Sequence, residues 1–218
     1  MTKDLTIGEQ IVLLALDEET GTLREAPLRV SLAVSAAALL ELSLSGCLTE
    51  RDGACVVTGA STPVDPAAVA MAERLQSHPE ETPRERLMAV REQALDTAYQ
   101  GLLEKGLVRE QGRRVLGAFG SVKYPVTDPS ELVALRARLT AVLAQGQDLD
   151  ERTAALITVL HHAGLETVIP QGPGAEVPEN RLAAIAEGQG PAAALGDTIR
   201  TTVAALTALT AVIASSAL

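Results

Sequence analysis

One segment of the chain combines basic and apolar residues in the way that membrane contact requires. The basic residues that border it and the apolar residues within it are Arg113, Arg114, Lys123, Leu116, Phe119 and Val122. A basic residue near an anionic leaflet contributes about 1 kcal/mol, and burial of a Phe or Leu side chain contributes about 1.5–3 kcal/mol. The pattern therefore predicts a hairpin tip that enters a lipid interface or contacts a neighbouring subunit. A hairpin that folds onto its own domain explains the pattern equally well.

Catalytic and metal-binding patterns give no comparable signal. His161 and His162 are adjacent, and neighbouring helical residues point about 100° apart, so the two do not readily share one metal ion. Histidines at a helix end are explained by the helix dipole. The sequence contains no phosphate-binding loop, dinucleotide fingerprint or G-x-S-x-G motif. We therefore predict a non-catalytic protein without a metal or cofactor.

The composition of the chain excludes some classes of binding partner. Lys plus Arg number 18 and Asp plus Glu number 28, which gives a net charge of −10. Phosphate backbones repel such a chain, and its 1% aromatic content leaves no stacking surface for single-stranded nucleic acid. We expect no nucleic-acid partner. The two cysteines lack metal-binding spacing and no signal-peptide pattern is present, which favours a cytoplasmic location.

Helix start and stop signals recur along the chain and predict a mainly α fold. We expect helices over residues 5–17, 28–45, 66–75, 83–105, 132–144, 151–162, 178–187 and 191–216. Capping boxes are predicted at 82–85 and at 128–131. Residues 28–45 are apolar around the whole circumference, which is typical of a helix buried at the centre of a bundle. The uncharged stretch 201–218 is too short and too polar for a membrane span, so we expect a buried helix there.

A weak internal repeat predicts two β-hairpins. In residues 47–57 and 107–116 a helix stops at Gly, a strand follows, and Asp52-Gly53 or Gln111-Gly112 turns the chain into a second strand. We predict one domain over residues 1–218. It is a bundle of amphipathic helices around a buried apolar core, with one or two hairpins, one of them protruding. Helix followed by hairpin also fits a winged-helix DNA binder, but the preceding helix is not basic.

Several short motifs, in order over about residues 4–216, resemble the Golgi phosphoprotein 3 family. They lie at residues 5–10, 13–17, 40–46, 103–108, 115–128 and 152–157. The resemblance implies a mostly helical domain with a protruding hairpin that assists membrane contact and oligomer formation. It also implies recognition of phosphatidylinositol 4-phosphate, as in eukaryotic members, and binding to cytoplasmic tails of glycosyltransferases.

The residues of the family's head-group pocket are not retained. Where the family has a Trp and three Arg, this sequence has Ala26, Ser35, Glu92 and Leu95. A phosphomonoester needs Arg or Lys donors, and among nearby residues Arg29 and Arg91 are the candidates for a rearranged anion site.

We therefore expect a peripheral protein on the cytoplasmic face of a membrane, which binds phospholipid head groups or the cytoplasmic tails of membrane proteins. The alternatives are a soluble homo-oligomeric scaffold without lipid binding and, less favoured by the charge, a winged-helix DNA binder.

Overall fold

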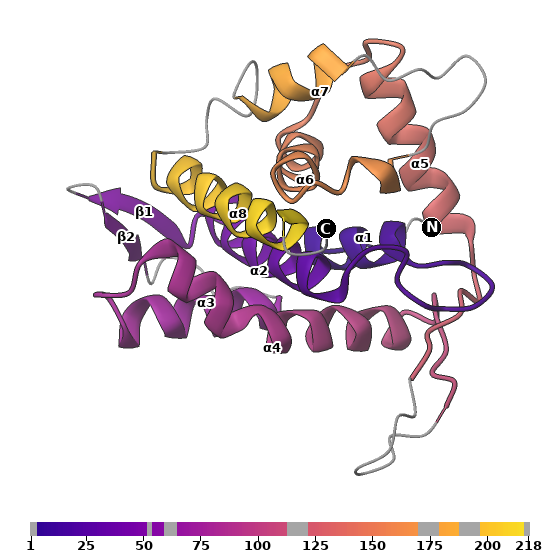
Figure 1. The fold of residues 1–218 in the computed structure, drawn as a ribbon, viewed down its shortest axis with the longest axis horizontal. Coiled ribbons are helices and arrows are strands. Elements are labelled where there is room, and N and C mark those ends of the chain that lie inside the picture. The colour runs from indigo at the N-terminus through magenta and orange to yellow at the C-terminus, as the bar shows by residue number, and fades with distance from the viewer. Residues whose placement is uncertain are drawn as a thin grey trace.

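The chain folds into a helical bundle with a small hairpin (Figure 1). The computed structural model describes residues 4–51, 54–58, 65–112, 122–169, 179–187 and 197–215. The elements in these ranges are α1 (Ile7–Ala15), α2 (Pro27–Leu44), β1 (Leu48–Arg51), β2 (Ala54–Val57), α3 (Pro66–Ser77), α4 (Pro83–Glu104), α5 (Ser130–Leu143), α6 (Glu151–His162), the 3-10 helix η1 (Glu166–Val168), α7 (Glu179–Ala186) and α8 (Asp197–Ser215). The predicted mainly α fold with a β-hairpin is confirmed.

Helix α2 forms the centre of the core. Every residue from Val30 to Leu42 is buried, and in Figure 1 the helix lies between α3 and α4 on one side and α6 and α8 on the other. Within the described residues, α2 is the one helix long and apolar enough to cross a membrane, and 72% of that window is buried inside the fold. Its all-round apolar surface is explained by packing in a helical core.

Local capping sets most helix starts. The capping box predicted at Thr82 is confirmed, because its side chain and that of Glu85 each accept a backbone N–H of the other residue. At the second box, predicted at 128–131, the side-chain cap by Asp128 is confirmed, one residue before the N-cap. Asp128 Oδ1 accepts the Ser130 N–H at 3.1 Å, but Pro129 is the N-cap of α5 and makes no side-chain cap bond.

The two predicted hairpins have different outcomes. The first is confirmed, with β1 and β2 paired from Leu48↔Val57 to Arg51↔Ala54. In the second, Gln111 and Lys123 exchange two backbone hydrogen bonds of 2.9 Å, so the return arm comes from residues 122–126. The turn predicted at Gln111-Gly112 is therefore wrong. The predicted tip, with Arg113, Arg114, Leu116 and Phe119, lies outside the described residues.

Contacts with the helical body explain the later register of this second hairpin. Tyr124 on the return arm stacks on Tyr99 of α4, with ring centroids 4.1 Å apart. On the other side, the loop between α1 and α2 accepts two backbone N–H groups, from Tyr124 to Gly21 O at 2.8 Å and from Val126 to Glu18 O at 3.0 Å. The return arm is thus clamped between this loop and α4. The described parts of both arms leave the body near the end of α4 (Figure 1).

Candidate functional site

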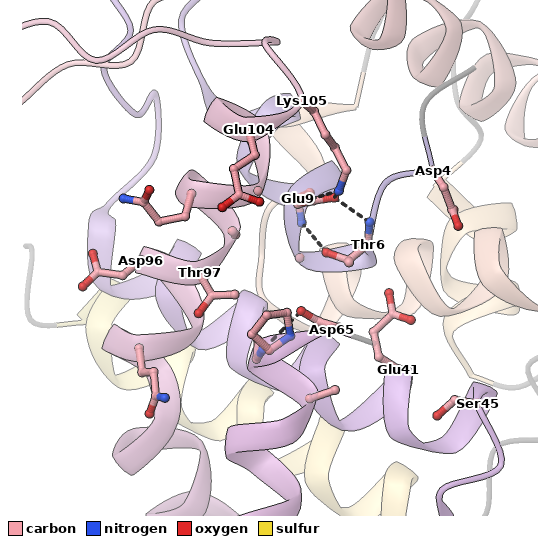
Figure 2. A pocket seen from close by; sticks show the side chains of 18 of the residues that line it. Asp4, Thr6, Glu9, Glu41, Ser45, Asp65, Asp96, Thr97, Glu104 and Lys105 are labelled. Carbon is pink, nitrogen blue, oxygen red and sulfur yellow. Dashed lines mark hydrogen bonds and ion pairs between the residues drawn. The ribbon is translucent and has the colours of Figure 1, made fainter. Parts of the chain in front are cut away.

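A cavity of about 1170 Å³ opens between the helices. It lies among the starts of α1 and α3, the end of α2 and one face of α4 (Figure 2), and Arg152 of α6 also lines it. Its acidic residues are Asp4, Glu9, Glu41, Asp65, Glu92, Asp96 and Glu104, and its basic residues are Lys105 and Arg152. Seven carboxyl groups against two basic groups give the cavity a formal charge of −5.

Both basic residues of the cavity are engaged by buried carboxylates. Lys105 Nζ lies 2.5 Å from Glu9 Oε1 and 2.6 Å from Oε2. Arg152 Nη2 donates to Glu41 Oε1 at 2.6 Å and also to the Leu5 carbonyl at 3.1 Å. Neither cation is therefore left to attract an anion, and the exposed carboxylates of Asp96 and Glu104 keep the opening negative.

The surroundings of two carboxyl groups in the cavity disfavour their charged form. Burial raises the pKa of Glu41 above its usual value, and the nearby charge of Asp65 raises it further, against the opposing effects of the Ile7 N–H and Arg152. Burial likewise raises the pKa of Asp65, although its side chain caps α3 by accepting the Ala67 N–H at 3.1 Å. A phosphate placed beside these two groups would raise their pKa values further, so a negative charge is disfavoured at this end of the cavity.

A glycine in the last turn of α4 makes room for the Glu9 side chain. A Cβ atom at Gly101 would lie 1.9 Å from Glu9 Oε1. Glycine inside a helix costs about 1 kcal/mol relative to alanine, so its presence there usually has a packing reason. This glycine and the Thr6–Glu9 capping box at α1 were the sequence signals from which part of the cavity could have been inferred.

The described basic residues predicted for a head-group site do not line this cavity, although Arg91 pairs with Glu92, which does. Arg29 Nη1 donates to the Gly164 carbonyl at 3.1 Å and lies 3.4 Å from Glu25. Arg91 donates to the Met88 carbonyl and pairs with Glu92 at 2.8 Å. Lys123 belongs to the hairpin arm.

The positions that correspond to the family's head-group pocket offer no free donor to a phosphate. Ser35 is buried and its hydroxyl donates to the Leu87 carbonyl at 3.0 Å. Leu95 packs against the core, Ala26 is the N-cap of α2, and Glu92 is acidic. Among the apolar residues predicted to contact lipid, Val122 is half-buried against the core, and Leu116 and Phe119 lie outside the described residues.

Fold and site together define a helical domain that carries a clamped hairpin beside an acidic cavity. Within the described residues no group of three or more His, Cys, Asp or Glu side chains is placed to hold a metal ion. The family model of Golgi phosphoprotein 3 (GPP34) matches residues 7–202, and the chain belongs to this family. The family is one of non-enzymatic proteins that bind lipid or protein and associate with membranes. No curated protein matches the sequence.

Proposed function

We propose that this protein attaches reversibly to the cytoplasmic face of a membrane through its second hairpin, without catalysing a reaction. The observation that carries the proposal is the pairing of Gln111 with Lys123 above the clamped Tyr124, which makes residues 113–121 the connection between two arms that leave the body. By sequence, Arg113 and Arg114 would meet lipid head groups while Leu116 and Phe119 enter the interface. Family membership supports this function.

Anionic charge, rather than one particular lipid, is the expected requirement for binding. The residues at the family's pocket positions supply no cation, and the cavity that one of them, Glu92, lines is acidic. We therefore expect vesicles of phosphatidylcholine and phosphatidylserine to bind the protein as well as vesicles of equal charge that contain phosphatidylinositol 4-phosphate. A strong preference for the latter would point instead to a site formed by Arg29 and Arg91.

Replacement of Phe119 by Asp is expected to reduce partitioning onto these vesicles about ten- to hundredfold, because an interfacial Phe contributes about 1.5–3 kcal/mol. Co-sedimentation measures the effect. Val133→Asp is the matched control, since Val133 is 59% exposed on α5 and its replacement adds the same charge away from the hairpin. Equal partition of the Phe119→Asp variant and the unmodified protein would refute the role of the hairpin in lipid contact.

The same variant distinguishes the alternative of a soluble oligomeric scaffold. Light scattering reports the mass of the particle in solution. A fall in mass for Phe119→Asp, with vesicle binding unchanged, would show that the hairpin joins subunits instead of entering lipid.

The cavity favours a second kind of partner, a basic cytoplasmic tail of a membrane protein. Its excess of carboxylates attracts Lys and Arg side chains, and its volume of about 1170 Å³ exceeds what a small metal ion needs. Glu92 and Asp96 are two of the exposed carboxylates of α4 that line the cavity, and a bound basic chain would meet them. Long-range attraction of this kind mainly raises the rate of association and weakens with salt.

The double change Glu92→Gln and Asp96→Asn is expected to weaken binding of a fluorescein-labelled oligolysine peptide severalfold at low salt, as measured by fluorescence anisotropy. The control is Glu73→Gln with Glu80→Gln, two exposed acids outside the cavity, which changes the net charge equally. If both pairs weaken binding alike, the peptide responds to overall charge and the cavity is not its site.

A further inference from the structure

The acidic cavity already holds an ammonium group, which belongs to Lys105 of the chain itself. The Lys105 Nζ atom lies 2.5 Å from one carboxylate oxygen of Glu9 and 2.6 Å from the other. Both residues line the cavity, and Figure 2 shows their side chains pointing toward each other. The protein's own lysine thus shows which chemical group this part of the cavity accepts, a primary ammonium against a carboxylate.

Glu9 is the fixed half of this ion pair. Its side chain is buried, and Oε2 accepts the Thr6 N–H at 2.8 Å within the capping box of α1. Gly101 of α4 leaves the space that the Glu9 carboxylate occupies, because a Cβ atom there would collide with Oε1. A carboxylate held in a buried position strongly requires a cation, since an uncompensated buried charge is destabilising.

Lys105 is the mobile half of the pair. It is the C-cap residue of α4 and is partly exposed, and its ammonium stands at the end of a flexible four-carbon stem. Arg152, the other cation of the cavity, is held more firmly, because it donates both to Glu41 and to the Leu5 carbonyl. An incoming ammonium that replaces that of Lys105 leaves the number of ion pairs at Glu9 unchanged, so the exchange does not strand the buried charge.

We propose that Lys105 is an internal competitor, which occupies Glu9 until a lysine side chain of a basic tail displaces it. The proposal rests on the binding of such a tail in this cavity, and it adds the carboxylate that recognises the ligand's ammonium and the contact that limits its affinity. Because the exchange at Glu9 gains no ion pair, net attraction must come from the exposed carboxylates of the cavity, such as Asp96 and Glu104. The competitor therefore selects chains with several basic residues over a single amine.

Anisotropy of a fluorescein-labelled oligolysine peptide in about 0.15 M salt tests the exchange. We expect Lys105→Met to raise the affinity about tenfold, because the peptide then pairs with a carboxylate that has lost its own cation. Arg24→Met is the matched control, since it removes the same charge from a residue outside the cavity. It should change the affinity less than about twofold, as salt screens exposed charges beyond about 8 Å. When Glu9 is replaced by Gln, Lys105→Met should give no such gain.

The outcomes separate the competitor from the binding function on which it rests. A gain that persists in the Glu9→Gln background, or that Arg24→Met reproduces, would refute the exchange. Binding of the peptide to the unmodified protein without a gain in Lys105→Met would overturn the competitor and leave the basic-tail function standing. If neither protein binds the peptide, both proposals are wrong.

A measurement on the unmodified protein does not depend on the folding of any variant. The lysines of the chain are Lys3, Lys105 and Lys123, and lysine labelled with ¹³C at Cε gives a nuclear magnetic resonance signal for each. On saturation with unlabelled oligolysine, we expect the Lys105 signal to move to the position of a hydrated lysine, while that of Lys123 on the hairpin arm stays in place. A Lys105 signal that does not move at saturation would contradict displacement.

Discussion

Gly21→Ala is expected to lower the free energy of unfolding by about 2–5 kcal/mol and to release the base of the second hairpin. Gly21 has φ of 65°, a left-handed conformation that costs an L-residue about 1–2 kcal/mol. Its added Cβ atom would also lie 2.0 Å from the Pro125 nitrogen and 2.3 Å from the Tyr124 carbonyl carbon. These are backbone atoms that cannot rotate away, and overpacking of this kind costs about 1–3 kcal/mol.

Gly46→Ala separates the two causes. Gly46 has a similar φ of 71°, but a Cβ atom there would meet nothing within 4 Å. Gly46→Ala should therefore lower the free energy of unfolding, measured in urea, only by the conformational cost of about 1–2 kcal/mol. Equal losses in the two variants would show that the loop between α1 and α2 does not press on the hairpin arm.

A spectroscopic signal reports this clamp directly. The chain has two tyrosines and no tryptophan, and both tyrosines, Tyr99 and Tyr124, stack at the base of the hairpin. Near-ultraviolet circular dichroism from tyrosine therefore comes from the clamp itself. We expect the signal to collapse in Gly21→Ala under conditions where the far-ultraviolet helix signal persists, and to remain in Gly46→Ala.

The helices could be predicted from the sequence because their signals are local. Thr82 and Glu85 are three residues apart and form their box wherever the helix lies, and Asp65 and Asp150 cap their own helices in the same way. The apolar circumference of residues 28–45 likewise fixes a buried position.

The register of the second hairpin could not be predicted from its own residues. It is decided by Gly21, about a hundred positions earlier in the chain, and by Tyr99 on another helix. A Gln-Gly pair is a weak turn signal, and tertiary contact overrode it. The long-range packing of Tyr124 thus determines that residues 122–126 form the return arm, which local pairing rules did not predict.

The acidic cavity was missed for a related reason. Its two ion pairs join residues 96 and 111 positions apart, and single carboxylates along a sequence read as solvated surface. Only the fold shows that Glu9 and Glu41 are buried and that their cations come from α4 and α6. The negative charge of the cavity is therefore a property of the assembled helices.

Removal of Lys105, the cation beside Glu9, tests how strongly the Glu9 carboxylate is shielded from water. Lys105→Met is expected to cost about 2–4 kcal/mol in urea unfolding. The Glu9 side chain is only 5% exposed, and loss of one partner of a buried pair typically costs about 3–5 kcal/mol because the other charge stays uncompensated. The lower figure reflects Lys105, which is 29% exposed and admits water when it is replaced.

Two further variants isolate this charge. Glu9→Gln in the Lys105→Met background should recover part of the loss, since the amide removes the stranded charge and its oxygen still accepts the Thr6 N–H that Glu9 accepts at 2.8 Å. Arg24→Met removes the cation from Asp17 in a pair whose side chains are 47% and 37% exposed, and it should cost about 0–1 kcal/mol. If Lys105→Met costs no more than Arg24→Met, then water already screens Glu9, and the attraction of the cavity for basic peptides would be correspondingly weak.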